Sequence, residues 1–201
     1  MERQKIFDIL MCDDIVDNIC TNLDELLALI PEIKDMIGFE HNHPHHHLDV
    51  WNHTLFALSM APKDFGIRLT LLLHDIGKPH SYQDREVRHF KGHPKVSSEI
   101  SYQILTRLNF NNNEIDELCY LIRQHDNPIN SNDINNNYLL SYKLFQVQIC
   151  DALAHNPLKL EKRINYLLSV NEMINDEDKK ENYNYLINNL YKEKNKTYIK
   201  R

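Results

Sequence analysis

The chain has 201 residues, of which 42% are hydrophobic and 26% are charged, and its net charge is -6. This length suits one domain with a full core, and the negative charge argues against strong binding to a nucleic acid backbone. No apolar stretch approaches the length of about 18 residues that a membrane span needs, and the N-terminus lacks the apolar segment of a signal peptide. The four cysteines form no C-x-x-C pair, so we expect reduced thiols in a cytoplasmic protein.

The scarcity of glycine, with 4 residues, favours helices over a many-stranded sheet. Apolar residues recur three or four positions apart in the N-terminal part, and residues 1–38 are predicted to be helical. Pro31 is expected to open a last short turn and Gly38 to end it. The segment 41–47, HNHPHHH, is predicted to be a loop. Most of its histidines should be exposed, where they could bind nickel or zinc without a function.

Helical periodicity resumes over residues 48–60 and again after Pro62. The centre of the second of these helices, LTLLL, is apolar nearly all round and should be buried. Gly77 and Pro79 are predicted to end it. Residues 80–92 are polar and rich in charge, and they are predicted to form a loop or a small hairpin.

Further helices are predicted in the second half of the chain. One covers about 94–108, and another, EIDELCYLIRQH, starts at Glu114 after three asparagines that provide a capping signal. An asparagine-rich loop is expected at 128–137, followed by a strong helix at 139–155. Two more polar helices are expected after Pro157.

Four residues from three helices need a charged or polar partner in apolar surroundings. His74 and Asp75 are adjacent at the end of the buried helix, where a His-Asp pair is costly unless it is paired or coordinated. Neighbouring helical residues diverge by about 100°, so the two can share one metal only if the helix ends there, as the following glycine and proline allow. His53 and Asp151 lie within other apolar helices. Imidazole and carboxylate together suit zinc, manganese, iron, nickel or cobalt better than magnesium alone.

The string LLLHDIGKP, with a histidine before it and an aspartate after it at helical positions, resembles the HD superfamily of metal-dependent phosphohydrolases. The segments HHHLDVWNHTL, RLTLLLHDIGKP and HFKGHPKVSSEI are most similar to the HD domain appended to bacterial tRNA nucleotidyltransferases. The resemblance covers about residues 45–155. It implies four metal ligands: His53, His74, Asp75 and Asp151. Residues 1–44 are too few for a nucleotidyltransferase domain, so only the hydrolytic activity of the HD part is expected.

The expected fold is an all-α HD-domain bundle that forms a single domain over residues 1–201. The HD core occupies about 45–155 and holds the metal near its centre. N-terminal helices at 1–40 and C-terminal helices at 157–195 are expected to pack on this core.

The resemblance also bears on the number of metal ions. His93 in FKGHP and His125 in RQHDN lie between the HD pair and Asp151. In HD proteins with two metals, histidines in these intervals bind the second ion, and the HD aspartate, here Asp75, bridges both. The pattern is therefore compatible with one divalent metal ion or with two, whether Mn, Fe, Ni, Co, Zn or Mg.

Several basic residues are candidates for binding an anionic substrate. Lys78 follows Asp75 by three residues and is expected at the mouth of the site, where it could contact a phosphate oxygen while Asp75 holds the ion and orients water. Residues 78–95 contain five basic and two acidic side chains, a net charge of +3 that would attract an anion.

Two further residues are weaker candidates for the substrate site. His47 precedes His53 by six residues, as a histidine does in the nucleotidyltransferase-linked group, and could face the substrate. Arg68 lies two helical turns before Asp75 and could pair with a ligand carboxylate or reach the substrate.

The expected function is hydrolysis of a small phosphomonoester or phosphodiester, of a nucleotide or a 2′,3′-cyclic nucleotide. One alternative is a dinucleoside polyphosphate hydrolase, which metal binding by both His93 and His125 would favour. The other is a non-catalytic module that binds a nucleotide or a metal, against which the intact HD-x-G-K string argues. Neither a membrane nor a nucleic acid is expected as a strong partner.

Overall fold

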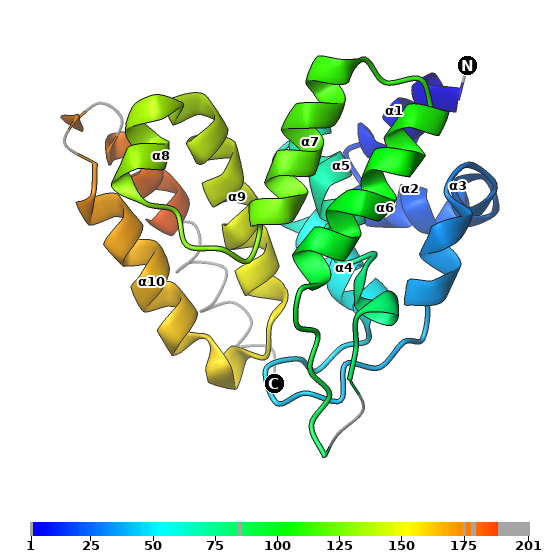
Figure 1. Cartoon of the computed structure of the whole chain (residues 1–201), viewed down its shortest axis with the longest axis horizontal. Coiled ribbons are helices and arrows are strands. Elements are labelled where there is room, and N and C mark those ends of the chain that lie inside the picture. Colours follow the sequence, from blue (N-terminus) through cyan, green and yellow to red (C-terminus); the bar gives the residue numbers. More distant parts are fainter. Residues whose placement is uncertain (1, 84–85, 175, 178–179, 189–201) are drawn as a thin grey trace.

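The computed structural model describes residues 2–83, 86–174, 176–177 and 180–188, and the chain within these ranges is built of helices and loops (Figure 1). The all-α class predicted from the sequence is confirmed. The extended pairing found in these ranges is a single antiparallel bridge between Gln83 and His89. None of the described helices combines the length and the apolar character that crossing a lipid bilayer would require.

The N-terminal segment is helical, as predicted, but it is divided into shorter pieces. These are α1 (Glu2–Leu10), α2 (Ile15–Thr21), α3 (Leu23–Leu29) and the 3-10 helix η1 (Pro31–Met36). Pro31 opens η1, and Gly38 follows it with a φ of +71°, a left-handed conformation that glycine adopts at little cost. The break between α2 and α3 falls at Asn22, whose side chain bonds to the backbone of the preceding turn.

Two central helices carry the HD pair and the histidine before it: α4 (Val50–Ser59) and α5 (Phe65–Leu73). Each begins after an aspartate that caps its first turn, since Asp49 accepts from the Asn52 amide at 2.7 Å and Asp64 from the Ile67 amide at 2.9 Å. Nearly all of α5 is buried, as predicted. The helix ends at Leu73, so the HD pair lies in the turn that leads to the 3-10 helix η2 (Lys78–His80).

The predicted helices of the second half are α6 (His93–Arg107), α7 (Asn112–Gln124) and α9 (Tyr138–Ala154). A capping box of Asn111 and Glu114 starts α7, as the asparagine run indicated. The loop predicted at 128–137 is wrong in part, because it contains the short helix α8 (Ser131–Asn136). Its asparagines act as helix caps: Asn130 caps α8 and Asn137 caps α9.

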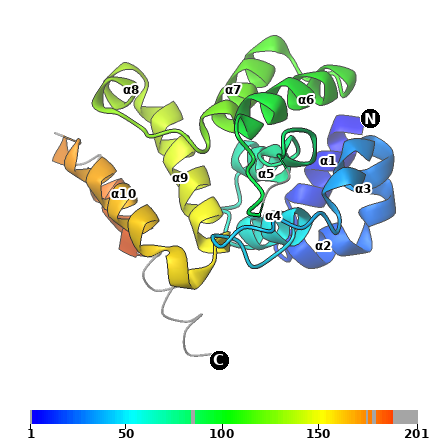
Figure 2. The same ribbon diagram turned by 60° about the horizontal axis from the view of Figure 1, so that its bottom comes forward.

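The C-terminal part packs against α9 through a second apolar cluster, which includes Phe145, Leu167 and Tyr183. It comprises the 3-10 helix η3 (Pro157–Lys159), α10 (Glu161–Glu172) and a helical stretch at 180–188. In Figure 1, α9 lies between α8 and α10 on one side and α7 on the other. Figure 2 shows α1 to α3 gathered beside α4 on the opposite flank. The remaining positions of the predicted 157–195 helices lie outside the described residues.

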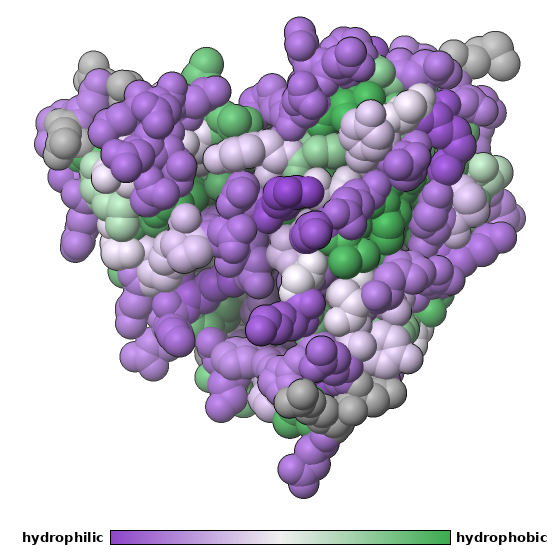
Figure 3. Space-filling view, viewed as in Figure 1, coloured by the Kyte–Doolittle hydropathy of each residue, from purple (hydrophilic) through white to green (hydrophobic). Residues whose placement is uncertain are grey.

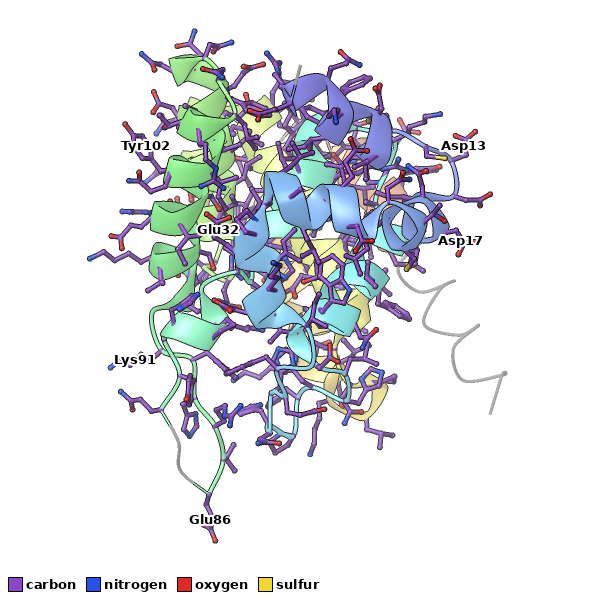
Figure 4. All side chains as sticks on the ribbon, turned by 90° about the vertical axis from the view of Figure 1, so that its right-hand side faces the viewer. Asp13, Asp17, Glu32, Glu86, Lys91 and Tyr102 are labelled. Atoms are coloured by element: carbon purple, nitrogen blue, oxygen red, sulfur yellow. The ribbon has the colours of Figure 1, made fainter. Side chains whose placement is uncertain are left out.

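The charged segment at 80–92 forms a small hairpin, one of the two forms predicted for it. The Gln83 amide donates to the His89 carbonyl at 2.9 Å, and residues 84–85 are outside the described ranges. Figure 4 shows this hairpin projecting from the body of the molecule with Glu86 at its tip. Gln83, Arg88 and His89 of the hairpin line the same cavity as Asp75.

Gly77 is expected to be essential to the turn that carries the HD pair. A Cβ at this position would lie 2.9 Å from the His93 carbonyl oxygen and closer still to the backbone nitrogen of Ser97. We expect Gly77→Ala to lower the free energy of unfolding by about 1–3 kcal/mol or more in urea denaturation. Gly66→Ala is the control, since its Cβ would meet only Asp64 Oδ1, at 3.4 Å, and should change stability by less than about 1 kcal/mol. Equal stability of the two variants would contradict the packing argument.

Candidate metal centre

The carboxylate of Asp75 lies between two pairs of histidines. Its Oδ2 atom is 3.6 Å from His53 Nε2 and 3.2 Å from His74 Nε2. Its Oδ1 atom is 3.2 Å from His93 Nε2 and 3.7 Å from His125 Nε2. The two oxygens of one side chain thus face different imidazole pairs, which is the arrangement expected of a carboxylate shared by two ions.

Asp151 from α9 completes the cluster on the side of the first pair. Its Oδ1 atom is 2.9 Å from His53 Nε2 and 3.7 Å from His74 Nε2. All the ligands predicted from the sequence are therefore brought together in one buried place. They come from α4, the turn after α5, the first residue of α6, the end of α7 and α9: His53, His74, Asp75, His93, His125 and Asp151.

The ring orientation of the four histidines is set by the backbone. The Nδ1 atoms lie within hydrogen-bond distance of carbonyl oxygens: His53 with Ala154 at 3.2 Å, His74 with Leu71 at 2.7 Å, His93 with Phe90 at 3.0 Å and His125 with Ile122 at 2.7 Å. A carbonyl can only accept, so each Nδ1 carries a proton and donates it. Each Nε2 then points into the cluster, available as a metal ligand, and the carbonyl supplies the outer support that metal-binding histidines usually have.

The unpaired atoms of the cluster fit a divalent cation. His74 Nε2 and Asp75 Oδ1 are buried and have no hydrogen-bond partner among the described residues, while Asp75 Oδ2 forms an ion pair with Lys78 Nζ at 2.7 Å. Unsatisfied polar atoms in the interior are costly, and a coordinated ion removes that cost. Among the described residues, two groups with ligand atoms within 4.8 Å of one another share Asp75: His53, His74 and Asp75, and Asp75, His93 and His125. A third such group comprises His53, Asp151 and His155.

Burial and neighbouring charges shift the pKa values of the groups in the cluster. Burial opposes ionisation of Asp75, but His74 and Lys78 outweigh it and hold the pKa of the carboxyl well below its usual range. Burial lowers the pKa of His74, yet the carboxylates of Asp75 and Asp151 more than offset this and raise it to about 10. Burial lowers the pKa of His125 to about 3. Burial therefore favours the neutral imidazole at His125, which is the form that coordinates a metal ion.

Lys78 is buried beside the cluster rather than exposed at its mouth. Its Nζ atom pairs with Asp75, donates to His41 Nε2 at 2.9 Å and lies 5.6 Å from the centre of the Phe90 ring. His41 in turn donates from Nδ1 to the Leu48 carbonyl at 2.8 Å. His41 is only 1% exposed, so the expectation of exposure does not hold for this member of the histidine run.

A cavity of about 990 Å³ opens over Asp75 and Asp151, between the hairpin, the 41–47 loop and the end of α7. Most of the face seen in Figure 3 is hydrophilic, with smaller hydrophobic patches, and the surface is hollowed near its centre. The basic residues that line the cavity are Lys78, Arg88, Lys91, Lys95 and Arg123. Their charge exceeds that of the three aspartates in the lining, so the opening is suited to an anion.

Two of the predicted substrate residues are not brought to this cavity. His47 is exposed and does not line it, whereas its neighbour His46 does, with its ring stacked 3.8 Å from that of His41. Arg68 is buried at the opposite end of α5, where it donates to the carbonyls of Leu10, Cys12 and Pro62. It satisfies carbonyls at and beyond the end of α1, and neither role suggested for it fits this placement.

The structure adds two residues that sequence reasoning missed. His155 donates from Nδ1 to the Asp151 carbonyl at 2.8 Å and lines the cavity. Arg163 of α10 donates to Asp151 Oδ2 at 2.5 Å. The spacing of His155, four residues after Asp151 on the same helix face, was a signal that could have been used. Arg163 lies in a polar helix beyond a proline turn, and no pattern linked it to the site.

Comparison with known proteins gives the family. The profile of the HD domain matches residues 45–171. The chain belongs to the HD domain family. This confirms the resemblance carried by LLLHDIGKP, and the matched region extends the expected core at its C-terminal end to include most of α10.

Two curated relatives of this HD protein are tRNA nucleotidyltransferases, and a third is a multifunctional CCA protein. An A-adding tRNA nucleotidyltransferase of Deinococcus radiodurans is 34% identical over 104 residues, which make up 48% of this chain and 24% of that protein. A CC-adding tRNA nucleotidyltransferase of Thermus thermophilus is 35% identical over 106 residues, which make up 48% of this chain and 24% of that protein. A multifunctional CCA protein of Shewanella denitrificans is 31% identical over 122 residues, 58% of this chain and 29% of that protein. The chain thus spans less than a third of these relatives.

Metal binding is expected to stabilise the folded protein through Asp75. At a free Mn²⁺ concentration 100 times the dissociation constant, the free energy of unfolding should rise by about 2.7 kcal/mol for each site filled. Asp75→Ala removes the ligand common to both groups and should abolish most of this gain. Asp17→Ala, an exposed aspartate of α2, should keep it. Equal metal-induced stabilisation of Asp75→Ala and the parent would show that Mn²⁺ binds elsewhere, such as on the loop histidines.

Proposed function

We propose that this HD protein is a metal-dependent phosphohydrolase that acts on a phosphomonoester or phosphodiester of a nucleotide, with a dinuclear centre. The observation that carries the proposal is that the two oxygens of the buried Asp75 carboxylate face separate histidine pairs. His53, His74 and Asp151 would hold one ion with Oδ2, and His93 and His125 the other with Oδ1. Membership of the HD family supports a hydrolase with divalent metal ions.

The chemistry divides between the ions and the protein. When bound, divalent ions supply Lewis acidity, which acidifies water and withdraws charge from a phosphoryl oxygen. The protein fixes the ligands, because each histidine is locked by a backbone carbonyl, and excludes bulk water, because the ligands are at most 7% exposed. Catalysis would then come from a rigid, dry site that needs little reorganisation.

Lys78 is proposed to bind a phosphate oxygen of the substrate. An ammonium group has three N–H donors, of which one is directed to Asp75 and one to His41. The third remains for a ligand in the cavity that Lys78 lines. Asp75 and His41 thereby hold the ammonium in place before the substrate arrives, which reduces the entropy lost on binding.

A nucleotide is the proposed substrate class. A cavity of about 990 Å³ is large enough for a nucleotide, and its basic residues suit phosphate. The names of two of the relatives connect them with tRNA, which favours a nucleotide or a 2′,3′-cyclic phosphodiester over an unrelated phosphoester.

Dinucleoside polyphosphates are a second candidate class, which the second histidine pair and two neighbouring cations favour. His93 and His125 face each other across α6 and α7, with Nε2 atoms 3.1 Å apart. Lys95 follows His93 by two residues and Arg123 precedes His125 by two residues, and both basic side chains line the cavity. The Arg123 guanidinium forms no hydrogen bond or ion pair with any other described residue. These cations could bind phosphates beyond the one that is cleaved.

Turnover of a phosphoester panel tests the proposal. Tag-free protein would be assayed with an aryl phosphate, a bis-aryl phosphate, 2′,3′-cyclic nucleotides and diadenosine polyphosphates, each with Mn, Ni, Co, Fe or Mg. We expect metal-dependent turnover of at least one nucleotide, lost in Asp75→Ala and retained in Asp17→Ala. Binding of metal and nucleotide without turnover under any condition would instead indicate a non-catalytic binding module.

Replacing Lys78 should weaken substrate binding. A charge-assisted hydrogen bond contributes about 1.5–3 kcal/mol, so Lys78→Ala should raise the KM for the best substrate by roughly tenfold or more at saturating metal. Lys63→Ala, which removes a surface lysine paired with Asp13, is the matched control and should leave the KM unchanged. An unaltered KM in Lys78→Ala would rule out the phosphate contact.

The Arg123 cation separates the two substrate classes. If dinucleoside polyphosphates are the substrates, Arg123→Ala should raise their KM several-fold and leave that of an aryl phosphate unchanged. Arg107→Ala, at the far end of α6, serves as the control because that arginine pairs with Glu32 away from the cavity. Equal effects of Arg123→Ala on both substrates would argue against a second phosphate position.

The cytoplasmic location expected from the sequence stays a prediction.

A further inference from the structure

Arg163 joins two carboxylates at the edge of the metal centre. It is the third residue of α10, and its Nη2 atom donates to Asp151 Oδ2 at 2.5 Å. Its Nη1 atom donates to Asp126 Oδ1 at 2.8 Å. Asp126 directly follows His125 in the chain, so one guanidinium connects α9 with the residue next to a ligand of the second histidine pair.

This contact divides the two oxygens of Asp151 between different tasks. Oδ2 is taken by Arg163, while Oδ1 faces His53 and His74. Charge-assisted bonds of a planar guanidinium are strong and directional, so they fix the plane of the carboxylate. Asp151 is left with a single oxygen to offer to a metal ion. Outer partners of this kind affect metal affinity although they never touch the metal.

We propose that Arg163 is a positioning residue of the metal centre, which holds Asp151 as a one-oxygen ligand and ties the C-terminal helix α10 to metal binding. The inference rests on the proposed metal-dependent function. The direction in which metal affinity changes when Arg163 is removed distinguishes positioning from simple charge balance. A cation beside the site repels a divalent ion, so if only charge mattered, removing Arg163 would tighten binding. If positioning dominates, its removal weakens binding.

The test is Mn²⁺ affinity, measured by competition with a fluorescent chelator on the full chain. We expect Arg163→Gln to weaken Mn²⁺ binding by roughly 10- to 100-fold. Arg163→Lys keeps the charge but lacks the two-armed fork, and should lie between Arg163→Gln and the parent. Asp126→Asn, which removes the second anchor of the guanidinium, should weaken binding by a smaller factor in the same direction.

The control is Arg107→Gln, which breaks an arginine–carboxylate pair with Glu32 on the surface, where both hydrogen bonds are 2.9 Å long. It should leave Mn²⁺ affinity unchanged, and circular dichroism would verify that every variant is folded before titration. Unchanged or tighter binding by folded Arg163→Gln would overturn the inference while the proposed function stands. No binding of Mn²⁺, Ni²⁺, Co²⁺, Fe²⁺ or Mg²⁺ by the parent protein would overturn the proposed function itself.

Discussion

The Asp75 carboxylate is buried in the middle of an apolar bundle, with only 1% of its surface exposed, directly after a helix that is packed on nearly all sides. An isolated carboxylate in such a place would lose several kcal/mol of hydration, so its surroundings must supply positive charge or coordination. Four imidazoles and one ammonium converge on it from five segments of the chain. The packing of α4, α6, α7 and α9 around the HD turn can be understood as the structure that this one buried charge requires.

Backbone carbonyls at the ends of helices orient the histidine rings around Asp75. The last turn of a helix leaves carbonyls without an internal partner, and His74 and His125 stand at the ends of α5 and α7, where each bonds to the carbonyl three residues earlier. One bond therefore satisfies an orphan carbonyl and fixes the tautomer of a proposed metal ligand. His93 uses the same three-residue spacing with Phe90, at the start of α6. Local helix geometry thus accounts for the orientation of three of the four rings.

The all-α class and the burial of the HD pair could be predicted from the sequence because both are encoded locally. LLLHDIGKP contains a buried helix, its ending and the HD pair in one string, and the bend that the pair needs is present at the end of α5. The convergence of His93 and His125 on the second oxygen of Asp75 is implied only by the family resemblance, because residue spacing alone does not determine side-chain direction. The asparagine-rich segment 128–137 is predicted to be a loop, but asparagine also caps helices, as Asn130 does for α8.

The remaining differences come from contacts between distant parts of the chain. The 41–47 loop is held by the Arg88 amide on the Asn42 carbonyl at 3.1 Å and by the Asn156 amide on the His45 carbonyl at 2.8 Å. These bonds accompany the burial of His41 and the turn of His46, rather than His47, toward the cavity. Arg163 reaches Asp151 only because α10 folds back along α9. No local pattern encodes such pairings.

The most direct test of the account is a crystal structure of the Mn²⁺-loaded protein with anomalous diffraction recorded near the manganese absorption edge. The account predicts two anomalous peaks on either side of the Asp75 carboxylate, about 3.5–4 Å apart, as in other two-metal sites. One peak should lie among His53, His74 and Asp151, and the other between His93 and His125. A single peak, or peaks only at the histidines of the 41–47 loop, would contradict the shared role of Asp75.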